Sequence, residues 1–171
     1  MKRHASLVPL SHNHHHGLVF ARRLRLAIEN GWEPLPSLRD KFRRVWEAEL
    51  EPHFQAEETV LAPAMEAADP ETAGPLLKRL AEEHATLREQ RDRVLREPSP
   101  DQLRAELLDF SRRLTAHIRF EERELFEAAQ RIVPPEGLEA LAEALEKAAP
   151  PPQPCPIELP PGASEPTEEP F

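Results

Sequence analysis

The chain has no tyrosine, a single cysteine and only five glycines among its 171 residues. The absence of tyrosine excludes an oxidase that works through a tyrosyl radical. The lone cysteine, Cys155, excludes an intrachain disulfide bond and suits a reducing compartment. No stretch approaches the roughly 20 consecutive apolar residues that a membrane-spanning helix needs. These absences predict a water-soluble chain whose stability comes from a packed core rather than from cross-links.

Positive charge is also in short supply. Lysine and arginine number 22 against 31 aspartates and glutamates, so the formal net charge is −9 at pH 7. An acidic chain of this kind is repelled by nucleic-acid backbones and anionic membranes, and we expect neither as a partner. The N-terminal stretch MKRHASLVPL lacks the apolar core of a signal peptide. We therefore expect a cytoplasmic protein.

Strand-like alternation of apolar and polar residues is not sustained anywhere, and proline divides the chain into helical segments. N-cap residues and stop signals predict four long helices. Their expected ranges are 11–30, 37–67, 76–96 and 99–132. Ser11 and Ser37 are the expected caps of the first two, and Pro52 and Pro63 are expected to kink the second.

The fourth helix has the clearest start, because SPDQ at residues 99–102 is a capping box with proline at the first helical position. Pro134 and Pro135 end it, and EGLEALAEALEKA then predicts a short fifth helix with Leu138, Leu141 and Leu145 on one face. Four long helices with short connections favour an all-α, antiparallel up-down-up-down four-helix bundle.

The composition changes at Pro150. Nine of the last 22 residues are proline, and most of the others are polar or acidic. We therefore divide the chain into a bundle domain, residues 1–149, and a tail, residues 150–171, that is extended or disordered and adds little to the core. We interpret the tail as solubilising, with Cys155 incidental. A docking arm for a protein partner, or a lid, is the alternative.

A repeat within the chain carries the chemistry. LEPHFQAEETVL at 50–61 and LTAHIRFEEREL at 114–125 fit one template, in which a histidine precedes a pair of glutamates by four residues and leucines flank both. His53 and Glu57, like His117 and Glu121, lie one helical turn apart on one face. Each pair can bind one cation, or two adjacent cations with the carboxylate bridging. The second glutamates, Glu58 and Glu122, we interpret as a solvated face, with support of the histidines as the alternative.

The other two long helices each supply a histidine on an apolar stripe. His84 interrupts a stripe of leucine and valine in the third helix. In the first helix, SHNHHHG offers four histidines, of which His14 is in register with the leucine stripe. His15 aligns with both Leu18 and Arg22, and His16 leads to apolar positions, so either can replace or supplement His14. His12 is peripheral.

These residues together predict a metal site. A lone histidine on an apolar stripe is usually a hydrogen-bonded core residue, but a whole constellation is different. Burying four histidines and two glutamates in one small core carries a heavy desolvation cost. Metal coordination removes most of that cost, because the ligands are deprotonated and directed inward. Imidazole with carboxylate suits iron, and manganese or zinc less well in a core with two carboxylates.

The constellation resembles the hemerythrin-like, or HHE cation-binding, family over about residues 7–148. The resemblance implies a four-helix bundle with two non-haem iron ions bridged by Glu57 and Glu121. It implies four terminal ligands, which are His14, His53, His84 and His117.

The sequence departs from the oxygen-carrying branch of that family. Those proteins have two histidines four residues apart in the third helix, whereas Leu80 and Arg88 stand at both such positions around His84. Their last carboxylate is usually an aspartate at a longer spacing, where this chain has Glu121. The pattern is more similar to bacterial members linked to oxidative and nitrosative stress and to iron–sulfur cluster repair.

The resemblance implies a partner that is a small molecule, either a diatomic gas (oxygen or nitric oxide) or peroxide. The chain would then bind or sense it, or act as an enzyme on it, with the catalytic residues unassigned. Iron storage or delivery, and a zinc-stabilised interaction module, are the non-catalytic alternatives.

Overall fold

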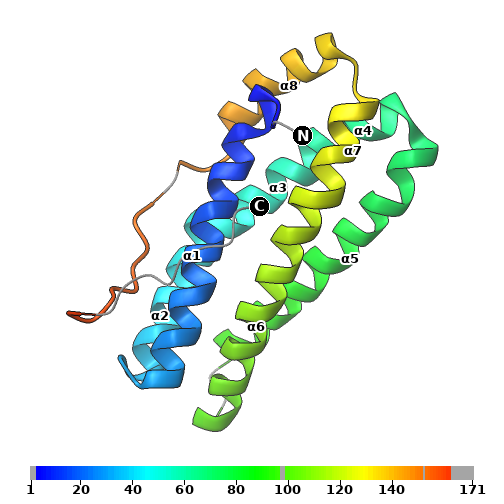
Figure 1. Cartoon of the computed structure of the whole chain (residues 1–171). Coiled ribbons are helices and arrows are strands. Elements are labelled where there is room, and N and C mark those ends of the chain that lie inside the picture. Colours follow the sequence, from blue (N-terminus) through cyan, green and yellow to red (C-terminus); the bar gives the residue numbers. More distant parts are fainter. Residues whose placement is uncertain (1–2, 97–98, 152, 163–171) are drawn as a thin grey trace.

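The computed structural model describes residues 3–96, 99–151 and 153–162 of the chain. Helices make up nearly all of the ordered structure, and the described residues contain no strand. Helical rods lie side by side in Figure 1, and the chain reverses direction between successive rods. The predicted all-α bundle is confirmed. Within the described residues, no helix is long and apolar enough to cross a membrane.

The first rod is α1 (Val8–Asn30), which follows a short 3₁₀ turn, η1 (Ala5–Leu7). The helix begins before the predicted Ser11, because Pro9 occupies its first turn, where no backbone N–H is needed. Its predicted end is confirmed: Gly31 adopts the left-handed conformation, with φ of 64°, and its N–H donates to the Ala27 carbonyl.

The second rod is a continuous run of α2 (Leu35–Val45), α3 (Glu51–Ala56) and α4 (Ala62–Ala68). Two π turns, η2 (Trp46–Leu50) and η3 (Glu57–Leu61), join the three segments. The rod begins at Pro34, not at the predicted cap Ser37, whose hydroxyl donates to Glu33 instead. The irregularities expected at Pro52 and Pro63 lie close to these π turns, each of which ends two residues before one of the prolines.

The third rod, α5 (Pro70–Leu95), starts six residues before the predicted Leu76. Asp69 caps it by accepting from the Thr72 N–H, and Pro75 is accommodated near the start. The fourth rod runs through α6 (Pro100–Phe120), the π turn η4 (Glu121–Leu125) and α7 (Phe126–Ile132). The predicted capping box is confirmed at its start, where Ser99 and Gln102 exchange hydrogen bonds.

The predicted fifth helix is confirmed as α8 (Pro135–Ala148), which lies across one end of the bundle with its three leucines buried. Beyond it, the described residues 150–151 and 153–162 form neither helix nor strand, in line with the expectation of an extended chain. The segment nevertheless adds one residue to the core, because Ile157 is fully buried in the main hydrophobic cluster. Half-buried Cys155 packs beside it, and burial raises the pKa of its thiol, which suits an unreactive cysteine. Residues 163–171 lie outside the described residues.

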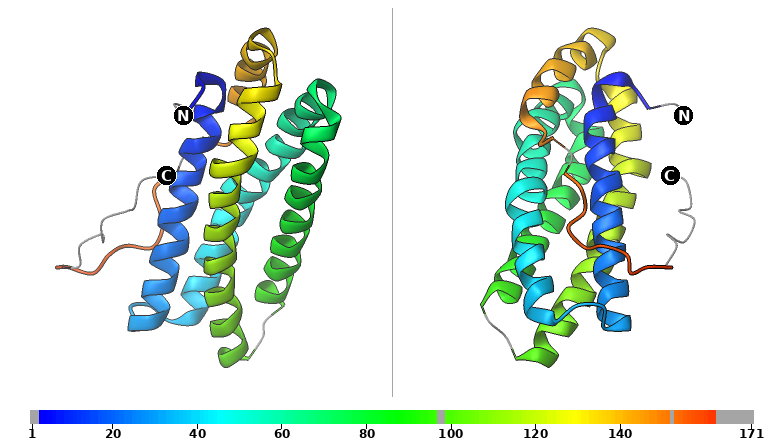
Figure 2. Two further views of the ribbon diagram at one scale, coloured as in Figure 1. Left: turned by 45° about the vertical axis from the view of Figure 1, so that its right-hand side comes forward. Right: turned by 90° about the vertical axis from the view of Figure 1, so that its left-hand side faces the viewer.

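Figure 2 shows this C-terminal segment crossing α1 on its way along the bundle. Three hydrogen bonds from α1 hold its backbone. Asn13 Nδ2 donates to the Pro150 carbonyl, His16 Nδ1 lies 3.1 Å from the Gln153 carbonyl, and Arg23 donates to the Ile157 carbonyl. The segment is therefore fastened to the first rod by its main chain as well as by a buried side chain.

Two hydrophobic clusters fill the bundle, one towards each end. Every rod contributes to both clusters and passes from one to the other within a few residues. In α3, Phe54 belongs to the first cluster and Ala56 to the second; in α5, Leu87 belongs to the first and Leu80 to the second. The layer between the clusters is where the polar residues of the sequence motifs lie.

Candidate metal centre

All six residues predicted from the sequence meet in this layer. Each is at least 96% buried. Their potential ligand atoms form two groups, and within each group the atoms lie within 4.8 Å of one another. One group contains His14, His53, Glu57 and Glu121, and the other contains His84, His117 and the same two glutamates. The arrangement offers two adjacent candidate positions for a cation, and both groups include the same two carboxylates.

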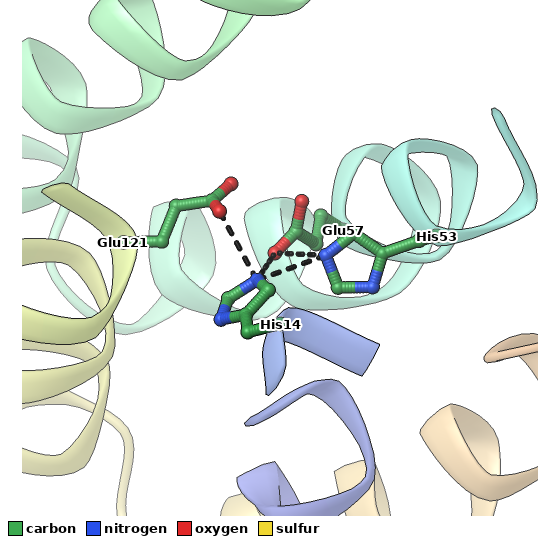
Figure 3. Close-up of side chains that lie close together, drawn as sticks. All are labelled: His14, His53, Glu57 and Glu121. Carbon is green, nitrogen blue, oxygen red and sulfur yellow. Dashed lines mark hydrogen bonds and ion pairs between the residues drawn. The ribbon is translucent and has the colours of Figure 1, made fainter. Parts of the chain in front are cut away.

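The two glutamates divide their oxygens between the histidine pairs. Glu57 Oε1 lies 3.4 Å from His53 Nε2, while its Oε2 lies 3.4 Å from His84 Nε2. Glu121 Oε2 lies 3.1 Å from His14 Nε2, while its Oε1 lies 3.0 Å from His117 Nε2. Figure 3 shows the first group, with His14 and His53 turned towards each other and both carboxylates directed at them. Each carboxylate is thus placed to bridge two cations.

The inward atoms lack ordinary hydrogen-bond partners. Both oxygens of Glu57, both oxygens of Glu121, and the Nε2 atoms of His84 and His117 are buried without one. In the first group, His14 Nε2 and His53 Nε2 face each other at 2.9 Å. Leaving so many buried polar atoms unsatisfied is costly in an apolar core. Cations supply the missing partners, so the donor set fits a metal centre.

π turns carry the two bridging glutamates. Both η3 and η4 begin at the first glutamate of the repeated motif, Glu57 in one rod and Glu121 in the other. A π turn inserts an extra residue into the helix, and such turns occur frequently at functional sites. Pro63 follows the first turn, but the second contains no proline and has none directly after it. The shared feature of the two π turns is therefore the motif rather than proline.

Outer carboxylates hold three of the histidines from behind. His14 Nδ1 lies 2.7 Å from Glu122, and His84 Nδ1 lies 2.7 Å from Glu58. The interpretation of Glu58 and Glu122 as a solvated face is therefore wrong, because the π turn that follows each bridging glutamate brings its neighbour behind a histidine of another rod. His117 Nδ1 lies 2.8 Å from Glu83, a residue that the sequence analysis missed. Its position directly before His84 was the one available signal.

The buried carboxylates and imidazoles of the cluster shift one another's pKa values. Burial lowers the pKa of His84, but the nearby carboxylates of Glu121, Glu57 and Glu58 outweigh it and raise the pKa to about 11. The same balance raises the pKa of His14 and of His117. Burial raises the pKa of Glu121, yet the neighbouring imidazoles hold it well below its usual range. Without metal, protons on the histidines therefore neutralise the carboxylates.

The structure also decides among the histidines of SHNHHHG. His14 is 1% exposed and enters the cluster, whereas His12 and His15 are exposed to solvent and His16 lies against the C-terminal segment. Gly17, one turn after His14, lets α1 approach α6 closely, since a Cβ there would lie 3.0 Å from the Ile118 side chain. Helical register thus selects one histidine of the four.

A small cavity adjoins the first group. It has about 10 Å³ of free space, enough for one water-sized molecule. Its lining includes His14, His53 and Glu121 on the polar side, and Gly17 and Leu50 among the apolar residues. A wider cleft of about 170 Å³ lies outside His117, between α5 and α6. The inner cavity is therefore the one that adjoins His14 and His53, and it has space only for a small molecule.

The fold and the site define the class of the protein: a helical bundle with buried histidine and glutamate groups suited to metal binding. The model of the hemerythrin HHE cation-binding domain matches residues 6–129, and the chain belongs to this family. No curated protein and no solved structure gives a significant match. The matched range ends within α7, so α8 and the C-terminal segment lie outside it.

Proposed function

We propose that the chain holds two non-haem iron ions and uses them to bind or react with a small molecule, which is oxygen, nitric oxide or peroxide. His14 and His53 would hold one ion, His84 and His117 the other, and Glu57 and Glu121 would bridge them. The observation that carries the proposal is the division of each carboxylate between two histidine pairs. When bound, a pair of irons supplies reversible redox chemistry and open coordination positions.

The protein's own residues set the conditions for that chemistry. The two hydrophobic clusters on either side of the polar layer exclude bulk water from it. The small cavity beside His14 and His53 has space for about one water-sized molecule. This space favours a small ligand, such as a diatomic molecule or peroxide, over a larger substrate.

The surroundings of His84 support reaction or metal handling over dedicated oxygen carriage. Leu80 belongs to the hydrophobic core, and Arg88 pairs with Glu51 and Glu58, so neither position four residues from His84 can supply a further imidazole. Four histidines leave more open positions on two irons than five would. We propose that the chain belongs with the bacterial, stress-related branch of the family and acts in the cytoplasm. Iron storage or delivery, and a zinc-stabilised module, are the alternatives.

Metal analysis with optical spectroscopy tests the proposal. Protein loaded with ferrous iron without oxygen should hold two irons per chain and should develop visible charge-transfer bands on exposure to air or nitric oxide. Glu121→Ala should lose iron, because it removes a shared carboxylate. Glu124→Ala is the matched control, since Glu124 lies in the same π turn but is exposed and pairs with Arg79.

Other outcomes would count against it. A firm value of one iron per chain, with iron in excess, would contradict the paired centre. Tight binding of zinc alone, with no visible bands after iron loading, would favour the interaction module. Loss of iron from the Glu124 variant would show that metal retention reflects general stability rather than the bridging carboxylate.

A further inference from the structure

We propose that the two metal positions are held unequally, and that the ion between His14 and His53 is the exchangeable one, because three arginine–glutamate pairs anchor the other histidines and none anchors His53. This inference rests on the proposed paired centre. It assigns positioning roles to Arg3, Arg79 and Arg88, which lie outside the sequence motifs.

Each outer carboxylate is itself held by an arginine. Arg88 lies 2.8 Å from Glu58 and 2.9 Å from Glu51. Arg79 lies 2.7 Å from Glu83, and Arg3 lies 2.6 Å from Glu122. Three chains of contact therefore run from the surface to the centre, each consisting of an arginine, a glutamate and a histidine.

A phenylalanine supports each of these arginines. The guanidinium of Arg79 lies 3.9 Å from the centre of the Phe120 ring. Arg3 lies 5.1 Å from the Phe126 ring, and Arg88 lies 5.9 Å from the Phe54 ring. Cation–π contacts of this kind add a modest stabilisation and restrict where the guanidinium can lie. The arginines are thus placed from two sides, by a carboxylate and by a ring.

His53 is the exception among the four histidines. Its Nδ1 is buried and has no hydrogen-bond partner. The acidic residue one turn before it, Glu49, receives the Gln153 N–H of the C-terminal segment. His53, Asn13 and Glu49 line the small cavity, and both Asn13 and Glu49 are tied to the C-terminal segment. His53 therefore borders a cavity and the C-terminal segment, whereas each of the other three histidines is backed by an arginine–glutamate pair.

Outer hydrogen bonds decide how firmly an imidazole is held. They fix the tautomer and the ring orientation, and their loss typically costs 10–100-fold in metal affinity. The ion between His84 and His117 would have two anchored imidazoles, whereas the ion between His14 and His53 would have one. Rotation of His53 towards the cavity would free a coordination position without disturbing an ion pair. The exchangeable ion is thus the one beside the cavity.

Chelation kinetics on the iron-loaded protein tests the inference. Ferrous protein is mixed with excess bipyridine without oxygen, and the coloured iron complex is followed with time. Two phases of one iron each are expected, with rates that differ by about 10-fold or more. Glu58→Gln, which weakens the support of His84, should speed only the slow phase. Glu122→Gln, which weakens the support of His14, should speed only the fast phase.

The control is Glu51→Gln, because Glu51 binds the same arginine as Glu58 but makes no contact with a histidine. It should leave the slow phase within about 2-fold of the parent, whereas the substitutions behind a histidine approach the larger effect of losing outer support. Glu83→Gln, behind His117, is a second test of the slow phase on another helix, should the Glu58 variant fold poorly.

The results separate this inference from the proposal beneath it. Two irons lost in one phase would overturn unequal anchoring and leave the paired centre standing. Acceleration of both phases by Glu58→Gln would also overturn it, because a general loss of stability would then explain the effect. A total of one iron per chain before chelation would contradict the paired centre and, with it, this inference.

Discussion

At the scale of single residues, helical register decides which of four neighbouring histidines enters the core. Successive side chains of an α-helix point about 100° apart, so a change of one position turns a residue away from the bundle axis. His14 faces the centre, while its neighbour His15 is exposed. The leucine stripe of the first helix predicted this choice, although His15 and His16 remained possible from the sequence.

A pair of substitutions checks the register. His14→Ala should lower the metal content and the melting temperature, because it removes an inward nitrogen and leaves the partners Glu121 and Glu122 less compensated. The lost compensation alone costs about 1–3 kcal/mol. His15→Ala changes a surface residue of the same type and should leave both quantities nearly unchanged. Measurements of iron per chain and of thermal unfolding give the result. Metal loss from the His15 variant with retention in the His14 variant would contradict the placement.

The contacts of the outer carboxylates could not be predicted from the spacing of residues along one helix. The contacts of Glu58 with His84 and of Glu122 with His14 each join two different rods. Spacing along one helix predicts which residues share a face, but not which residue of a neighbouring helix stands behind it. The sequence therefore predicted the six inward residues, and the three outer partners emerged only from the packing.

At the scale of elements, sequence signals succeeded where a local interaction determines the structure. The capping box at Ser99 and the left-handed Gly31 each depend on a few adjacent residues, and both appear as predicted. The starts of α2 and α5 did not, because Pro34 and Asp69 provide earlier starts than the predicted ones. Proline was read as a helix breaker, yet in these helices it occupies the first turn, where a missing N–H is harmless.

The docking of the C-terminal segment onto α1 was not predicted from its sequence. Its composition predicts a chain that cannot form a core of its own, and that remains so for the segment alone. Docking onto an existing bundle needs far less, and one buried isoleucine with backbone hydrogen bonds to α1 is enough to hold it. Composition gives no sign of a single anchoring residue such as Ile157.

Removal of the segment should therefore destabilise the bundle. Ile157→Ala empties a fully buried site, and changes of this kind cost about 2–5 kcal/mol. Truncation after Ala149 should cost at least as much, and the melting temperature should fall by several degrees. Truncation after Gly162 is the control, because it keeps every contact described for the segment. Thermal unfolding of the three variants decides the matter, and equal melting temperatures would show that Ile157 contributes little.

At the scale of the whole molecule, the bundle consists of two hydrophobic clusters with a polar layer between them. Each rod supplies apolar residues to both clusters and at least one polar residue to the layer. Burial of the two clusters stabilises the fold, whereas burial of ionisable side chains in the polar layer lowers the free energy of unfolding. Metal ions or protons must compensate the two carboxylates, so the charge state of the molecule and its metal content are linked.

This linkage predicts that metal uptake releases protons. The pKa of His84 in the metal-free fold is about 11, against an ordinary value of 6.5, and the pKa values of His14 and His117 are also raised. The raised pKa keeps His84 protonated at pH 7 in the absence of metal, whereas a metal ligand must be neutral. Each proton displaced makes binding more favourable as the pH rises.

The sign of the effect on stability is opposite for the two forms of the protein. A histidine whose pKa is raised by folding stabilises the fold fully below about pH 6.5, and this stabilisation is lost as the pH rises through the folded value of about 11. The metal-free protein should therefore lose stability between these limits. The metal-loaded protein should gain stability relative to it over the same range, because protons no longer compete for the imidazoles.

Thermal unfolding of both forms from pH 6 to pH 9, with proton release followed by an indicator dye at pH 7, tests the linkage. A constant difference in melting temperature across this range, or uptake without proton release, would show that the histidines are already neutral in the metal-free protein.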